Sequence, residues 1–180
     1  GKRIPWETCH TFSGSWGYHR DETTWKDTKQ LLGILIESVS TGGNMLLNVG
    51  PTARGNFDYS VDESLRKIGE WMKYNSKSIY GCTQAPDGFD APENCRLTYN
   101  SETKRLYIHL FDYPVKNLKL PGYGGKIKYA QFLHDGSEIK IGKRYGYGTM
   151  EETNMNDIYL EIPINKPNQT IPVIELVLYK

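Results

Sequence analysis

Apolar residues recur at helical spacing in the first part of the chain and at alternate positions in the second part. A helix is predicted over residues 28–40, because its apolar side chains follow the spacing i, i+3, i+4 and i+7: Leu32, Leu35, Ile36 and Val39. Asp27 or Thr28 can cap its start, and Gly42-Gly43 supplies a left-handed exit. A second helix is predicted from a capping box of Ser60 and Glu63 to about Asn75. Its inward face is expected to carry Val61, Leu65, Ile68 and Met72.

The run from Asn44 to Val49 is continuously apolar, as in a strand buried within a parallel sheet. Residues 6–9 can form an earlier short strand, which gives a β-α-β-α order and implies parallel pairing. Two such units can neither close a barrel nor cover both faces of a sheet. We therefore expect this chain to be the C-terminal part of a larger protein.

The helical period disappears after residue 84, and short segments of period two take its place. These segments predict strands over residues 96–99, 105–111, 126–133, 138–141, 158–164 and 171–178. Their alternation, interrupted by Gly, Pro and Asn turns, is typical of an antiparallel β-sandwich. We predict two domains, an α/β portion over residues 1–84 and an all-β sandwich over residues 85–180.

Composition narrows the function classes. The net charge of +1, with acids and bases interspersed, gives no footprint for nucleic acid. No run of 18 apolar residues predicts a membrane span, and residues 1–6 lack the apolar segment of a signal peptide. Three cysteines fit neither a disulfide framework nor a zinc spacing; Cys82 and Cys95 can pair in a secreted protein, but free thiols are favoured. No metal and no cofactor are expected.

Two motifs in one order resemble a known family. WETCHTFSGSWGY is followed by a helix and GGNMLLNVGPTARG, and this combination is similar to the α-L-fucosidases of glycoside hydrolase family 29. The resemblance extends from residue 5 to about residue 82, and the β-rich remainder matches only in position and class. It implies the last strands and helices of a (β/α)8-like barrel followed by a C-terminal β-sandwich. It also implies retaining hydrolysis of terminal α-linked L-fucose from fucosylated glycans or glycoconjugates.

The same resemblance assigns candidate site residues. The nucleophile of the family is an Asp on an earlier barrel strand, which these 180 residues lack. Without that missing N-terminal barrel portion, the isolated chain is expected to be inactive. Glu7 is a candidate acid/base, because an acid beside the indole of Trp6 is held partly out of water, although a structural carboxylate is an equal alternative. Trp16 resembles the aromatic residue that packs on the C6 methyl of fucose, with an ordinary core tryptophan as the alternative. Trp6 and Tyr18 are further substrate-binding candidates, although core packing is favoured for Tyr18.

The sequence offers further candidate residues and an alternative function. His10, His19, Arg20 and Asp21 are expected near the active-site opening of the barrel, and Asn48 is expected to bond neighbouring backbone. Tyr123 and the Tyr145–Gly148 loop look like exposed aromatics in glycine loops of the sandwich; carbohydrate binding is one interpretation, and packing on an edge of the sandwich is preferred. The alternative function is a non-catalytic carbohydrate-binding or structural β-sandwich module. The resemblance is compatible with a homo-oligomer and implies a secreted, periplasmic or lysosomal location.

Overall fold

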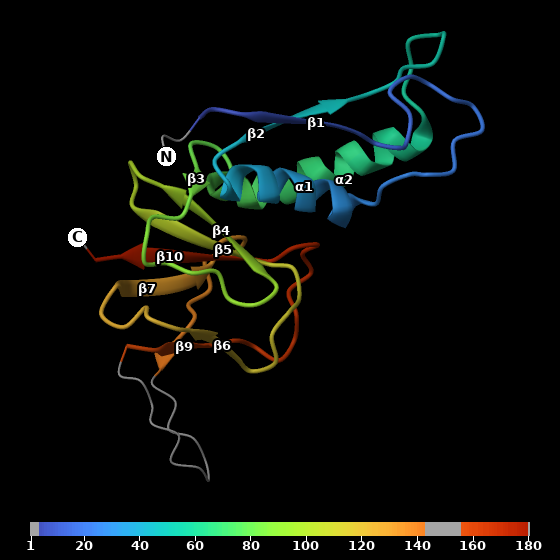
Figure 1. Ribbon diagram of the computed structural model, residues 1–180. Helices are drawn as coiled ribbons and strands as arrows, with labels where there is room; N and C mark the ends of the chain where they lie inside the picture. Colours follow the sequence, from blue (N-terminus) through green and yellow to red (C-terminus); the bar gives the residue numbers. More distant parts are fainter. Residues whose placement is uncertain (1–3, 143–155, 180) are drawn as a thin grey trace.

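The computed structural model describes residues 4–142 and 156–179, and Figure 1 shows their arrangement in four layers. A small parallel sheet lies on two helices, the helices lie on a five-stranded sheet, and a three-stranded sheet closes the other side. The helices are α1 (Thr28–Ser40), α2 (Tyr59–Asn75) and the short 3-10 helix η1 (Ser76–Ser78). The strands are β1 (Glu7–Thr11), β2 (Asn44–Asn48), β3 (Thr83–Gln84), β4 (Cys95–Asn100), β5 (Arg105–Leu110), β6 (Asn117–Leu120), β7 (Ile127–Phe132), β8 (Ile141–Gly142), β9 (Ile158–Glu161) and β10 (Val173–Leu178).

The small sheet confirms the predicted parallel pairing. β1 and β2 run side by side from Glu7 opposite Asn44 to Thr11 opposite Asn48. Side chains alternate along each strand, so Leu47 packs with Leu31 of α1 while Leu46 points to the other face and is 47% exposed. The helices cover one face of this sheet, and the face that carries Leu46 has no cover among the described residues.

Helix α1 has the predicted bounds. The Asp27 carboxylate accepts a hydrogen bond from the Gln30 backbone N–H at 2.7 Å, and the Gln30 side chain accepts one from the Asp27 N–H at 2.8 Å. This reciprocal capping box satisfies two backbone donors that the first turn would otherwise leave open. At the other end, Gly42 adopts a φ of 84°, the left-handed conformation that the double glycine predicts.

Helix α2 begins earlier than predicted. Its N-cap is Asp58, whose carboxylate accepts from the Ser60 N–H at 2.9 Å, so the proposed capping box of Ser60 and Glu63 is wrong. Glu63 instead pairs with Lys67 one turn later, at 2.7 Å. Of the predicted inward residues Val61 is buried, but the most deeply buried aromatic residue on the helix is Trp71.

The second half forms two antiparallel sheets, in agreement with the sandwich prediction. The five-stranded sheet has the order β3-β4-β5-β10-β7, and the three-stranded sheet has the order β6-β9-β8. One face of the larger sheet packs on the smaller one, and the residues at the centre of this core include Ile108, Leu120, Leu160, Ile174 and Leu176, all fully buried. Burying these side chains contributes on the order of 2 kcal/mol each.

The opposite face of the five-stranded sheet packs on the helices. Tyr107 and Val173 meet Leu32 and Ile36 of α1, and Trp71 of α2 lies in the same cluster. The Trp71 indole N–H donates to the carbonyl of Ile171 at 2.7 Å. The central sheet is therefore buried on both faces, and the helical and β-rich parts of the chain share one core.

Several strand predictions need correction. β6 was not predicted, because its four residues lie between a lysine and a Pro-Gly turn and give too short a pattern. The segment predicted over residues 158–164 ends at Glu161, since Pro163 cannot donate to a sheet ladder.

Cys82 and Cys95 are both free thiols, and they pack in different cores on opposite faces of the sheet. None of the helices in the described ranges is long and apolar enough to cross a bilayer.

Candidate functional site

Two loops leave the same edge of the parallel sheet and meet beside it. The first follows β1 and carries Trp16 and Tyr18, and the second follows β2 and begins at Asn48. The Asn48 side-chain amide donates to the carbonyl of Trp16 at 2.5 Å, as expected for an amide that bonds neighbouring backbone. The carboxyl ends of parallel strands are the usual position of active-site loops in α/β proteins. This loop pair, residues 12–18 and 48–51, is the candidate site and is called the mouth below.

Glycine is required where the two loops cross. A Cβ on Gly50 would lie 2.6 Å from both the carbonyl carbon of Gly17 and the backbone nitrogen of Tyr18. These are backbone atoms and cannot swing aside. Gly50 therefore permits the close approach that brings the Trp16 loop against the end of β2.

A network of hydrogen bonds fixes the loop that carries Trp16. The Glu22 carboxylate accepts from the Thr24 hydroxyl at 2.6 Å and from its backbone N–H at 2.8 Å, and Thr24 Oγ1 accepts from the Gly14 N–H at 2.8 Å. The hydrogen bonds from Thr24 lower the pKa of Glu22 to about 2, so this carboxylate is a permanent acceptor. The Lys26 ammonium donates to the carbonyls of Thr11 and Ser13, each at 2.9 Å.

The two aromatic residues of the mouth are exposed. Trp16 is 61% exposed and Tyr18 is 45% exposed, so neither packs in a core formed by the described residues, and the core packing favoured for Tyr18 is wrong. An indole held at a braced loop and left open to solvent is a flat apolar surface that a ligand can cover.

Trp6 and Glu7 lie at the other end of β1. The strand runs from Glu7 to Thr11, rather than over residues 6–9, and its five residues separate Glu7 from the mouth by about 13 Å. The Trp6 ring packs over Gly43, where an added Cβ would lie 2.3 Å from the ring, and its indole N–H donates to the Thr41 carbonyl at 3.4 Å. The structure thus groups the four predicted site residues into two pairs, and it does not bring Glu7 next to Trp16.

The remaining candidates are also spread out. His10 faces α1 and lines a groove with Gln30 and Ile34, whereas His19 is exposed on the loop. Arg20 pairs with Asp21 at 3.3 Å on the surface. In residues 4–142 and 156–179, no cluster of three His, Cys, Asp or Glu side chains is placed as metal ligands would be.

Two groups of aromatic residues in the sandwich were also considered as candidates. Tyr123 packs in the sandwich, as preferred from the sequence, and does not offer an exposed ring: it is fully buried, donates to the Asp90 carbonyl at 2.9 Å and stacks edge-on with Phe89. Its burial raises the pKa of its phenol. The Tyr145–Gly148 loop lies outside the described residues.

Glu22 and Lys26 are contributors to the mouth that the sequence did not single out. A signal was present, because a carboxylate two residues before a threonine in a loop is a common local acceptor. The long reach of Lys26 back to residues 11 and 13 leaves no such pattern.

Comparison with protein families places the chain among known enzymes. Residues 1–77 match the family model described as alpha-L-fucosidase. The plasma alpha-L-fucosidase of Homo sapiens is 41% identical over 165 residues, which cover 88% of this chain and 33% of that protein. An alpha-L-fucosidase of Branchiostoma floridae is 36% identical over 112 residues, covering 61% of this chain and 25% of that protein. The chain therefore spans a third or less of the length of these two curated relatives.

Solved structures give the same result. Alpha-L-fucosidase isoenzyme 1 from Paenibacillus thiaminolyticus superposes with a TM-score of 0.89 at 36% identity, over 100% of this chain and 41% of that one. A family 29 alpha-L-fucosidase from Bacteroides thetaiotaomicron superposes with a TM-score of 0.81 at 26% identity, over 98% of this chain and 38% of that one. The latter is a trapped covalent intermediate with 2-fluoro-fucosyl fluoride in a Glu-to-Gln mutant.

Proposed function

The chain belongs to the α-L-fucosidase family, matching the C-terminal part of its members, and from this premise we propose that the protein removes terminal α-linked L-fucose from glycans. The observation that carries the proposal is the mouth itself. A braced loop holds exposed Trp16 and Tyr18 at the carboxyl ends of two parallel strands. The alternative of a stand-alone β-sandwich module is not favoured, because the matched relatives are enzymes and residues 1–77 carry the family match.

We propose that β1-α1-β2-α2 are the last two units of a (β/α)8-like barrel, with residues 1–84 as barrel and residues 85–180 as sandwich. The face of the small sheet opposite the helices supports this assignment. Leu46 and Cys9 are exposed there, and Cys9 and Leu46 are paired in the parallel register. In a closed barrel that face points to the interior, so further strands would cover it.

The reaction proposed is hydrolysis with retention of configuration. A carboxylate nucleophile attacks the anomeric carbon of fucose while a carboxylic acid protonates the leaving oxygen, and water then displaces the enzyme carboxylate. The trapped covalent intermediate of the Bacteroides relative supports this two-step route. We assign the nucleophile to a barrel strand outside these 180 residues.

We propose that Trp16 places its indole against the C6 methyl group of fucose and that Tyr18 lines the same pocket. L-Fucose lacks a hydroxyl at C6, so an apolar face at that position favours it over a hexose with a hydroxymethyl group. A buried methyl group contributes about 1 kcal/mol, which corresponds to a preference of about fivefold.

Glu7 as acid/base, and Trp6 as a further substrate contact, stay predictions. Glu7 stands at the start of β1 on the face that a barrel would enclose, about 13 Å from the mouth along the strand. Replacing it separates the two roles. If Glu7 is the acid/base, E7Q in the complete enzyme should lower kcat most for substrates with poor leaving groups. If Glu7 is structural, E7Q should lower stability, and the loss of kcat should be the same for all substrates.

The decisive experiment compares the hydrolytic activity of the 180-residue chain with that of a longer protein that includes the upstream part of the barrel. The chain alone is expected to release no nitrophenol from nitrophenyl α-L-fucoside, and the longer protein is expected to release it. In the longer protein, W16A should lower kcat/KM by about fivefold or more. The matched control is Y80A, since Tyr80 is 71% exposed and lies far along the chain from the mouth. Turnover by the chain alone would refute the assignment of the nucleophile.

The names of the relatives also support a substrate class and a location. We propose fucosylated glycoconjugates as substrates and an exported location, supported by relatives named plasma and tissue alpha-L-fucosidases. Release of fucose from glycoproteins by a culture supernatant, or by a periplasmic or lysosomal fraction, with none released by the cytosolic fraction, would support both.

A further inference from the structure

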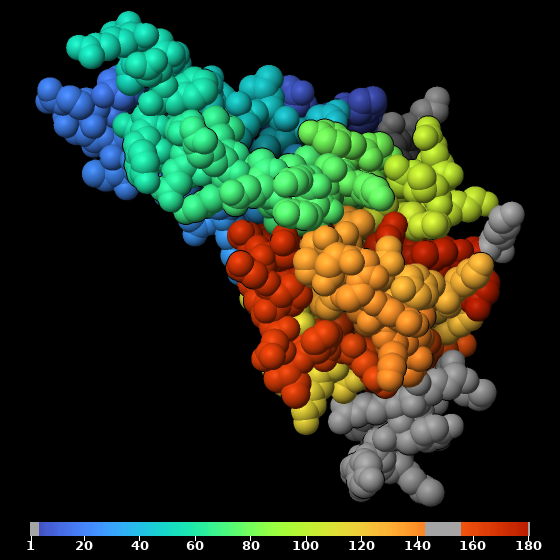
Figure 2. Space-filling model, turned by 180° about the vertical axis from the view of Figure 1, so that it is seen from behind, coloured from blue at the N-terminus to red at the C-terminus, as the bar shows by residue number. Residues whose placement is uncertain are grey.

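A polar groove lies between α2 and the β-rich part of the chain, away from the mouth. Its volume is about 650 Å³, within the range of small-molecule sites. One wall is the second half of α2, and the other wall comes from residues 134–135 after β7 and residues 168–170 before β10. Figure 2 shows the face where these three segments meet: green α2 above, with the orange and red segments below it.

The groove is separate from the candidate active site. Val61 of α2 lines the space beneath the Trp16 loop, and the groove begins at Lys67 and extends to Tyr74. With a rise of about 1.5 Å per residue, these positions lie about 9–20 Å farther along the helix.

The walls are held at a fixed separation. The Trp71 indole N–H donates to the Ile171 carbonyl at 2.7 Å, directly after the loop, and Trp71 is 3% exposed. The Asn75 amide donates to Gln169 Oε1 at 3.1 Å. Because both bonds join α2 to the loop, a ligand would find the groove already formed and would lose little affinity to ordering it.

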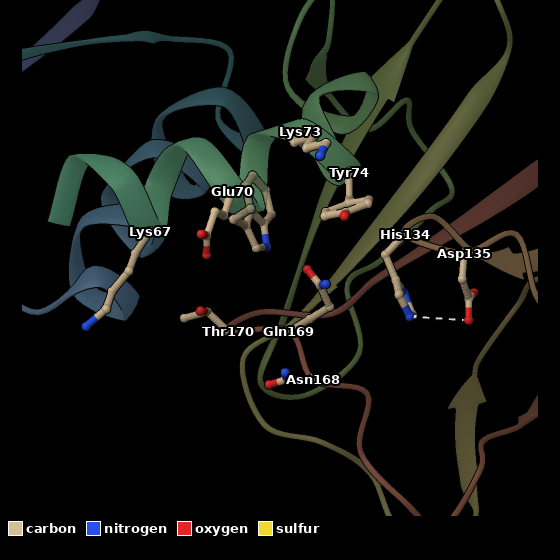
Figure 3. A pocket seen from close by; sticks show the side chains of 10 residues that line it. Lys67, Glu70, Lys73, Tyr74, His134, Asp135, Asn168, Gln169 and Thr170 are labelled. Carbon is tan, nitrogen blue, oxygen red and sulfur yellow. Dashed lines mark ion pairs between the residues drawn. The ribbon is translucent and has the colours of Figure 1, made fainter. Parts of the chain in front are cut away.

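The charges along the groove balance. Lys67, Glu70 and Lys73 come from α2, and Asp135 lies on the opposite wall (Figure 3). Lys67 is already paired with Glu63 at 2.7 Å, and Asp135 lies 3.4 Å from His134. A phosphate or another polyanion would meet as many carboxylates as ammonium groups, so the groove favours a neutral ligand.

Polar groups in the groove are available to such a ligand. The side chains of Asn168 and Thr170 line the groove and are exposed to solvent. Each of these groups can bond a hydroxyl. Tyr74 is 48% exposed in the same groove, and the Lys73 ammonium lies 5.5 Å from the centroid of its ring, which leaves the rest of the ring to contact a ligand (Figure 3).

We propose that this groove binds a neutral oligosaccharide, with one pyranose ring on Tyr74 and its hydroxyls on the side chains of residues 168–170. Vicinal hydroxyls that donate and accept match the amides and hydroxyl of this loop, and the apolar C–H face of a sugar matches the ring of Tyr74. If the protein acts on fucosylated glycans, as proposed above, the groove would hold a part of the glycan that carries no reacting bond. The binding itself does not depend on hydrolysis.

The test measures sugar binding by the 180-residue chain, using calorimetry and ligand-observed NMR. The probes are N-acetyllactosamine, chitobiose and cellobiose, with a sulfated disaccharide as the anionic comparison. At least one neutral disaccharide is expected to bind at millimolar concentration, and the sulfated one more weakly. Y74A should weaken binding about tenfold, whereas Y74F, which keeps the ring, should not.

Two controls make the outcome decisive. Tyr179 is 58% exposed and does not line the groove, so Y179A should bind like the unchanged chain. Q169A removes the amide that joins the walls and should also weaken binding. The proposal is overturned if none of the three neutral probes binds, if Y74A and Q169A bind as the unchanged chain does, or if the sulfated disaccharide binds best. Since no step of this test uses hydrolysis, inactivity toward fucosides would count against the proposed function and leave the groove standing.

Discussion

His109 makes a sharp prediction about acid stability. It is fully buried on β5, its Nε2 lies 2.9 Å from the hydroxyl of Thr98, and its ring centroid is 6.2 Å from that of Trp71. Thr98 Oγ1 donates its own hydrogen to the Ser78 carbonyl at 2.6 Å, so it must accept from the imidazole. This assigns the Nε2–H tautomer and leaves Nδ1 without a partner among the described residues.

Protonation at Nδ1 would place a charged donor in the core with no acceptor. Desolvation accordingly lowers the pKa of His109 from 6.5 to about 3. Between those values the unfolded chain binds a proton that the folded chain does not, so the free energy of unfolding falls as the pH falls. The slope is about 1.4 kcal/mol per pH unit, and the loss between pH 6 and pH 4 is about 2.5 kcal/mol.

The assay is urea unfolding of the chain and of H109Q at both pH values, followed by tryptophan fluorescence. Glutamine does not titrate, so the loss between the two pH values should be about 2.5 kcal/mol smaller in H109Q. Carboxylates that titrate in both proteins cancel in this difference. The exposed His19 gives the control, because H19Q should keep the full loss. Equal losses in the unchanged chain and H109Q would refute the reasoning.

Three further predictions follow from the contacts described above. G50A should disrupt the mouth and lower kcat/KM of the complete enzyme by at least about tenfold, because its Cβ would meet loop backbone at 2.6 Å; G17A, with no atom within 4 Å of its Cβ, should not, and equal effects would contradict this. D27A should lower the free energy of unfolding in urea by about 1 kcal/mol through loss of the α1 capping box, and a change smaller than that of the exposed D87A would count against it. In alkylation followed by mass spectrometry near neutral pH, exposed Cys9 should be modified before Cys82 and Cys95, because burial raises the pKa of Cys82 to about 11 and that of Cys95 to about 12; early labelling of Cys95 would show that its core opens.

Local patterns predicted the elements that carry their own signals. Helix α1 was predicted with its bounds, its cap and its left-handed exit, because each depends on residues within a few positions. β10 was predicted from its alternation, and Ile174 and Leu176 do face the sandwich core. The alternation of β10 does not indicate that Val173, on the opposite face, is buried as well by α1 and α2. That burial depends on packing between segments far apart in the chain.

The loop that carries Trp16 was predicted from the sequence, whereas the bounds of the strand before it were not. The exposure of Trp16 agrees with a loop at the mouth, and the bond from Asn48 to the Trp16 carbonyl agrees with its expected role. The first strand was predicted over residues 6–9 and spans Glu7–Thr11, because its pairing register with β2 decides where it begins and ends. The start of α2 was missed for a similar reason, since Asp58 and Ser60 are both good caps and only the backbone geometry chooses between them.

The position of β10 has a consequence for synthesis. Val173–Leu178 comes after every other described strand in the sequence, yet in space it lies between β5 and β7, and it contributes to both cores. Until a ribosome has released this segment, β5 and β7 have no shared neighbour and their apolar faces stay open. A stop codon just before residue 173 would therefore be as damaging as one far upstream. A chaperone that shields nascent chains would have to cover the apolar faces of β5 and β7 until β10 has been synthesised.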